Sequence, residues 1–117
     1  VTCILKEEME YLEKEVFKII ALSTKNSVLF TETISIGGLN SCTVHPRDVF
    51  RTLVKVGANA CIVVHNHPSG DPAPSSEDIR LTENLIEAGK ILGISVLDHV
   101  IIGLGGRYES LKEKGIM

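Results

Sequence analysis

The chain has 117 residues, 44% of them apolar, which is enough for one compact core and too few for two, so we expect a single domain over residues 1–117. Fifteen acidic and twelve basic residues give a net charge of −3, which disfavours a nucleic-acid-binding surface. Apolar runs such as Ile19 to Leu22 are far too short for a membrane span or a signal peptide. We therefore expect a cytoplasmic protein.

The cysteines are three in number and widely spaced, at Cys3, Cys42 and Cys61, without a C-x-x-C pair. This spacing argues against a disulfide framework and against a four-cysteine zinc site. We expect them to be buried, reduced thiols.

The first part of the chain predicts a short helix followed by a hairpin. Leu5, Met9 and Leu12 have helical spacing within residues 5–13. Strands are predicted at 15–22 and 28–36, with turn-forming residues at 24–27 between them. Along the second strand a period of two places five residues on one face: Val28, Phe30, Glu32, Ile34 and Ile36. The carboxylate of Glu32 on this apolar face is a candidate functional group.

The rest of the chain alternates predicted helices and strands. A helix is expected from Pro46 to about Val56, ended by Gly57, and another from about Ser76 to Leu92, ended by Gly93. Their predicted buried stripes are Val49, Phe50, Leu53 and Val54 in the first helix and Leu81, Leu85, Ala88 and Leu92 in the second. Residues 60–65 form a continuous apolar run typical of a central strand covered on both faces. Strands near 94–102 and 107–111 complete a mixed sheet with helices packed on its faces.

Two histidines follow this central strand in a pattern that suits metal binding. His65 and His67 are separated by one residue, so in an extended chain their imidazoles leave the same face. Pro68 ends the strand, which puts the pair at a sheet edge where a coordination position can remain open.

Asp78 is the candidate third ligand. The core-facing stripe of the helix after the loop, extended back by three residues from Leu81, reaches Asp78, so this carboxylate is predicted to point inward. Two imidazole nitrogens and one carboxylate oxygen, with water in the fourth position, are the ligands expected of catalytic zinc. A histidine pair alone is weak evidence, however, and Ser75-x-x-Asp78 also fits a helix capping box.

The complete string carries a specific resemblance. His65-x-His67-Pro68, six further residues and Ser75-x-x-Asp78 match the JAMM (MPN+) metalloprotease motif at every defining position. From about residue 14 to residue 112 the chain resembles the RadC-like branch of that superfamily. The segments that carry this wider resemblance are Thr24-Lys25-Asn26, Leu39-Asn40, Val44-His45-Pro46-Arg47, His65-Asn66-His67-Pro68-Ser69-Gly70 and Leu97-Asp98-His99.

The departures from the family pattern are few. Ser23 stands where the family usually has Asp, and Gly38 where it generally has Thr. Neither position is one of the predicted ligands. Complete RadC-like proteins also carry an N-terminal helix-hairpin-helix segment, which these 117 residues do not include.

The resemblance implies a deaminase-like fold, a three-layer α/β/α sandwich with a mixed sheet, and a zinc-dependent, isopeptidase-type site. Bound zinc lowers the pKa of its water to roughly 7 and polarises a carbonyl oxygen. By position in the family Glu15 is the general base and Ser75 the donor to the oxyanion. Glu32 is the rival base. The H-x-E and P-C-x-x-C signature of zinc deaminases is absent, so the fold does not imply deaminase chemistry.

Three other polar residues have structural or supporting interpretations. His45, before Pro46, is expected to be a loop or helix-capping residue. Asp98 and His99 alternate faces in a strand, so one of them points inward, either as a buried hydrogen-bonded residue or as a partner of a ligating histidine.

The sequence is compatible with two functions. The leading one is a zinc metalloprotease or isopeptidase that acts on a protein or peptide. The alternative is a DNA-repair-associated or protein-binding module whose metal site is structural or vestigial.

Overall fold

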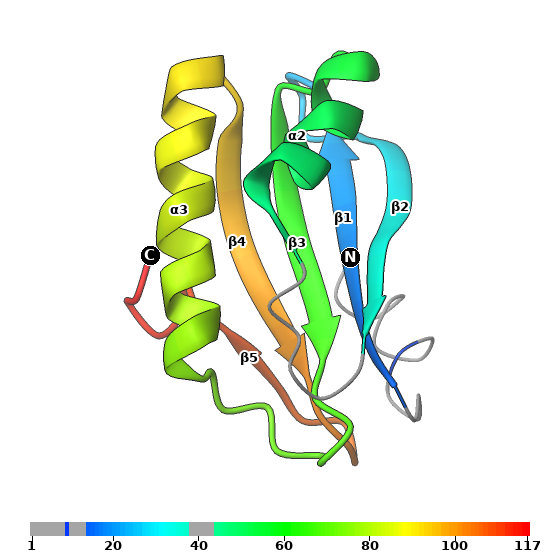
Figure 1. Cartoon of the computed structure of the whole chain (residues 1–117), viewed down its shortest axis with the longest axis vertical. Coiled ribbons are helices and arrows are strands. Elements are labelled where there is room, and N and C mark those ends of the chain that lie inside the picture. The colour runs from blue at the N-terminus through cyan, green and yellow to red at the C-terminus, as the bar shows by residue number, and fades with distance from the viewer. Residues whose placement is uncertain (1–8, 10–13, 38–43) are drawn as a thin grey trace.

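The computed structural model describes residues 9, 14–37 and 44–117. Within them a five-stranded sheet is joined by two helices (Figure 1). The elements are β1 (Glu15–Leu22), β2 (Val28–Gly37), α2 (Pro46–Lys55), β3 (Ala60–Asn66), α3 (Ser76–Leu92), β4 (Ser95–Ile102) and β5 (Tyr108–Ser110). Apart from Met9, which is helical, the predicted helix at 5–13 lies outside the described residues.

The sheet has the strand order β2-β1-β3-β4-β5, with β3 in the centre. β3 pairs antiparallel with β1 and parallel with β4, so the prediction of a central strand is confirmed. Because α3 connects the two parallel strands, its first turn lies near the end of β3 where the histidines are (Figure 1). The sheet is mixed, as predicted.

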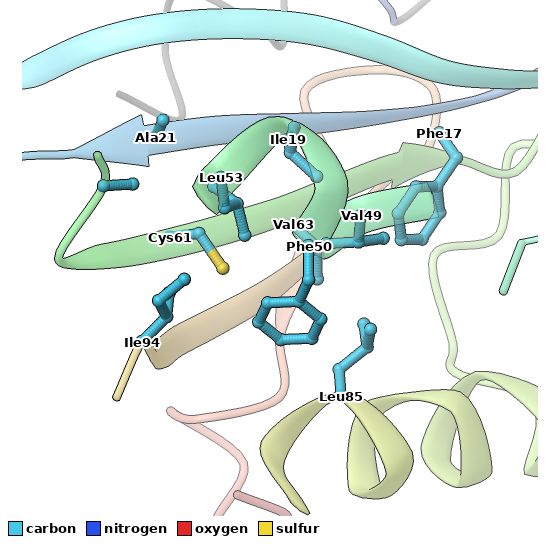
Figure 2. Packing of buried hydrophobic residues seen from close by; sticks show 11 residues of the cluster. Phe17, Ile19, Ala21, Val49, Phe50, Leu53, Cys61, Val63, Leu85 and Ile94 are labelled. Atoms are coloured by element: carbon cyan, nitrogen blue, oxygen red, sulfur yellow. The ribbon is translucent and has the colours of Figure 1, made fainter. Parts of the chain in front are cut away.

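Both helices pack on one face of the sheet. Figure 2 shows Phe50 of α2 and Leu85 of α3 pointing into the space above β1 and β3. They contact a cluster of buried residues that includes Ile19, Cys61 and Val63, each without exposed area. Each large apolar side chain buried in such a core contributes about 1.5 to 3 kcal/mol, so this layer holds the helices in place.

The opposite face of the sheet is also covered with apolar side chains. Val16, Ile20, Val64 and Val100 form a second buried cluster, and Met9, without exposed area, packs into it. An α/β fold is therefore confirmed. The second helical layer of the predicted sandwich would fall on residues 5–13, of which only Met9 is described.

Some predicted core positions are on the surface. Val54 is 58% exposed although the neighbouring Leu53 is fully buried, and Leu92, the last residue of α3, is 49% exposed. Val28 and Phe30 are exposed at the start of the edge strand β2. The predicted free thiol of Cys61 is buried, while Cys3 and Cys42 lie outside the described residues.

The described residues contain no helix that is both long and apolar enough to cross a membrane.

Candidate metal centre

His65 and His67 lie at the end of β3, on the face that the helices cover. His65 is fully buried, and its ring stacks on Phe17 of the neighbouring strand, with centroids 5.9 Å apart and an angle of 20° between the planes. The side chain of His67 is 16% exposed. The Nε2 atoms of the two imidazoles lie 3.1 Å apart. The two rings therefore converge as the alternating spacing predicted.

Asp78 completes the group from the first turn of α3. Its Oδ1 is 3.2 Å from His65 Nε2, and its Oδ2 is 3.2 Å from His67 Nε2. Ligand atoms on a tetrahedral zinc, each about 2.0 to 2.1 Å from the ion, are about 3.3 Å from one another. The observed separations of the three groups match that spacing. Among the residues that the structure describes, His65, His67 and Asp78 form the group of potential ligands close enough together to hold a metal ion.

The capping interpretation of Ser75 and Asp78 is also correct. Ser75 is the N-cap of α3: its Oγ accepts from the Asp78 N–H at 3.1 Å, and Asp78 Oδ2 accepts from the Ser75 N–H at 2.9 Å. The two interpretations are compatible because the capping box fixes the rotamer that turns the Asp78 carboxylate toward the histidines. The cap uses a lone pair of Ser75 Oγ and leaves its hydroxyl hydrogen available to a ligand.

Hydrogen bonds between Asp78 and the histidines shift the pKa values of Asp78 and His67. Burial would raise the pKa of Asp78, but hydrogen bonds from His65 and His67 outweigh burial and hold that pKa well below its ordinary value. The hydrogen bond to Asp78 raises the pKa of His67, against the effect of burial, and the charge of Glu15 adds to the rise. A carboxylate held in its charged form beside two imidazoles is ready to bind a cation.

The outer nitrogens of both rings are engaged. His67 Nδ1 lies 3.0 Å from the main-chain carbonyl of Asp71. His65 Nδ1 lies 2.7 Å from His99 Nε2, and His99 Nδ1 lies 2.6 Å from the Thr82 hydroxyl. Burial lowers the pKa of His99 to about 3, so this ring is neutral.

Of the residue pair on β4, His99 is therefore the inward residue and contacts a predicted ligand. Asp98 has a different role, because its carboxylate accepts from the Ser110 hydroxyl and from the Lys112 N–H and ties the C-terminal segment to the sheet. His45 is the N-cap of α2, where its Nδ1 accepts from the Arg47 N–H, as the capping interpretation predicted.

Glu15 begins β1 at the same end of the sheet. Phe17 pairs with His65, so extending this antiparallel register by two residues brings Glu15 beside His67. The side chain of Asn66 fixes this strand end by accepting from the Val16 N–H at 2.7 Å and donating to the Lys14 carbonyl at 3.0 Å. Its two hydrogen bonds bracket Glu15.

The rival carboxylate lies elsewhere. Glu32 lies midway along the edge strand β2, where it pairs with Ile19 and accepts a hydrogen bond from the Thr52 hydroxyl of α2. The sequence analysis noted the in-phase position of Glu32 and favoured Glu15 by its position in the family. It is Glu15, however, whose charge acts on His67.

Sequence reasoning missed two buried residues of this centre. Asn66, 2% exposed, stands between the two histidines, and its position inside the motif was the available signal. Thr82, 1% exposed, lies four residues after Asp78, which is the spacing of side chains on one helix face. Its polar character excluded it from the predicted apolar stripe.

Comparison with known proteins gives consistent results. The family model described as the RadC-like JAB domain matches residues 1–116. A UPF0758 protein of Caldanaerobacter subterraneus subsp. tengcongensis is 60% identical over 112 residues, which are 96% of this chain and 48% of that protein. A UPF0758 protein of Alkaliphilus metalliredigens is 59% identical over 117 residues, all of this chain and 50% of that protein. The chain spans about half the length of these curated relatives, and their names state no activity.

Proposed function

The chain belongs to the family of RadC-like JAB domains, and from this premise we propose that it is a zinc-dependent hydrolase of amide bonds in a protein or peptide, of the peptidase or isopeptidase type. The observation that carries the proposal is the convergence of two imidazole nitrogens and a carboxylate at separations of 3.1 to 3.2 Å. The Nε2 atoms of both rings face each other and the Asp78 carboxylate.

The donor set fits zinc better than calcium or magnesium. Imidazole suits zinc, whereas calcium and magnesium prefer oxygen ligands throughout. Three protein ligands leave a fourth position for water or substrate, which is typical of catalytic rather than structural zinc. The partial exposure of His67 and Asp78, beside a buried His65, supports access to that position from solvent.

The chemistry divides between the metal and the chain. Zinc held by His65, His67 and Asp78 would supply Lewis acidity toward water and toward the carbonyl oxygen of the substrate. Glu15 accepts the proton of the attacking water and returns it to the leaving nitrogen, which completes the hydrolysis. The Ser75 hydroxyl donates to the oxyanion that forms at the carbonyl.

The test is metal analysis combined with hydrolysis assays of two matched variants. We expect about one zinc per chain, lost in His65→Ala. Glu15→Gln should keep zinc but lower hydrolysis about 10²- to 10⁴-fold, because Gln preserves the size of Glu and cannot accept a proton. Glu32→Gln is the control and should leave hydrolysis largely intact, since Glu32 contacts Thr52. The substrates are a panel of peptides and isopeptide-linked peptides.

The outcomes separate the two functional classes. Loss of activity in Glu32→Gln alone would move the base to that residue. Zinc binding without hydrolysis of any substrate, by the parent and by longer versions of the chain, would favour a protein-binding module with a structural metal.

A further inference from the structure

His65 differs from His67 in what holds its outer nitrogen. A metal-binding histidine must carry its hydrogen on the nitrogen that faces away from the metal, and a hydrogen-bond acceptor there fixes that arrangement. For His67 the acceptor is the carbonyl of Asp71, which can only accept. For His65 it is the imidazole of His99, which can donate or accept according to where its own hydrogen lies.

The direction of this hydrogen bond is therefore decided one step further on, at Thr82. The Thr82 hydroxyl lies 2.6 Å from His99 Nδ1 and 2.8 Å from the main-chain carbonyl of Asp78. The hydroxyl has one hydrogen, and the carbonyl can only accept. If that hydrogen pointed to His99, two acceptor oxygens would face each other at 2.8 Å.

A single arrangement satisfies the contacts of Thr82 and His99. Thr82 donates to the carbonyl of Asp78 and accepts from His99 Nδ1–H. His99 Nε2 is then an acceptor, so His65 Nδ1 donates to it. His65 Nε2 can then exchange its hydrogen bond to Asp78 for a lone pair directed at a metal ion held between His65, His67 and Asp78. Both predicted ligand histidines thus end on a main-chain carbonyl, His67 directly and His65 through two other side chains.

We propose that His99 and Thr82 are positioning residues that hold His65 in the proton arrangement able to bind the metal. This role rests on the proposed metal site. His99, His65 and Thr82 are each at most 1% exposed, so no water competes for these hydrogen bonds. His99 lies on β4, His65 on β3 and Thr82 on α3. The series of hydrogen bonds ends at the main-chain carbonyl of Asp78, whose side chain is the third predicted ligand.

The proposal makes a specific prediction for Thr82→Val, which removes the hydroxyl and preserves the shape of the side chain. His99 Nδ1–H would then lack its acceptor, and the ring would be free to carry its hydrogen on Nε2, against His65 Nδ1. We expect zinc affinity, measured by titration against a chromophoric chelator, to fall about 10- to 100-fold. Thr82→Ser keeps the hydroxyl and should restore most of the affinity.

The matched control is Thr52→Val on α2, which also removes a threonine hydroxyl with a side-chain partner, but away from the metal centre. It should leave zinc affinity unchanged, whatever it does to thermal stability. Nitrogen-15 NMR of the histidine rings in the zinc-bound parent is a second measurement, independent of any variant. It should show hydrogen on Nδ1 of His65 and on Nδ1 of His99.

Two results would overturn the proposal: zinc affinity of Thr82→Val equal to that of the parent, or a hydrogen on His99 Nε2 in the zinc-bound protein. If the parent itself bound no zinc, the proposed function would fail instead, so the two failures are distinguishable.

Discussion

Gly103 offers a test of how the loops position His67. It follows β4 and has no positive φ, so an alanine there would carry no penalty from backbone conformation. A Cβ at this position would nevertheless lie 2.3 Å from the carbonyl oxygen of Gly70 and 2.9 Å from Pro72 Cδ. These two residues flank Asp71, whose carbonyl accepts from His67 Nδ1. A single added methyl group should therefore reach the metal centre through the loop.

The size of the effect follows from the contacts. Side-chain Cβ atoms essentially never approach another heavy atom closer than 3.0 Å, so the Gly70 carbonyl or the Gly103 backbone must move by at least 0.7 Å. That carbonyl accepts from the Leu104 N–H and from the Arg107 guanidinium. Complete loss of one neutral and one charged hydrogen bond costs about 2 to 4 kcal/mol, so the melting temperature should fall by up to about 8 to 16 °C.

Gly103→Ala should also lower zinc affinity about 10-fold or more, because the acceptor that orients His67 is displaced. The measurements are thermal unfolding by circular dichroism and zinc titration against a chelator. Gly105→Ala is the control: its φ of +67° makes alanine unfavourable by about 1 kcal/mol, but no atom lies within 4 Å of the added Cβ. It should retain zinc affinity. Parental stability and zinc affinity in Gly103→Ala would refute the reasoning.

Three further predictions concern other parts of the centre and the core. Asn66→Ala removes both hydrogen bonds that bracket Glu15, so hydrolysis should fall by up to about 100-fold. Zinc analysis should still give one ion per chain, and a loss of zinc would contradict this prediction. The hydrogen bond to Asp78 raises the pKa of His67, so zinc affinity, titrated at several pH values, should fall about tenfold for each pH unit below that pKa. The same raised pKa stabilises the metal-free fold below about pH 6.5, and this contribution is lost as the pH rises through the folded value. Burial raises the pKa of the Cys61 thiol to about 12, so with the other two cysteines replaced by serine a thiol reagent should label the protein only after it unfolds.

The local sequence was sufficient for much of the fold. The limits of α3 follow from short-range chemistry, because Ser75 caps its first turn and Gly93, with a φ of 74°, ends it. The uninterrupted apolar run of β3 predicted a strand buried on both faces. The ligand set was also local in origin: an alternating pair of histidines on a strand, and an aspartate in phase with a helix stripe.

The partners of those ligands depended on tertiary structure. His99 is 34 residues from His65 in the chain, and the two rings meet only because β3 and β4 are parallel neighbours in the sheet. Likewise the position in the family favoured Glu15 over Glu32, but the antiparallel pairing of β1 with β3 is what brings Glu15 to the histidines. Strand order and register are set by contacts that close long loops, which no short window of sequence contains.

The limits of the buried stripes were decided in the same way. Periodicity identified most of the inward face of each helix, but Val54 and Leu92, which it assigned to those faces, are 58% and 49% exposed. A helix repeats its faces along its whole length, whereas the sheet beneath it is finite and twisted. Periodicity therefore determines which direction a side chain points, and only the packed structure determines whether anything is there to cover it.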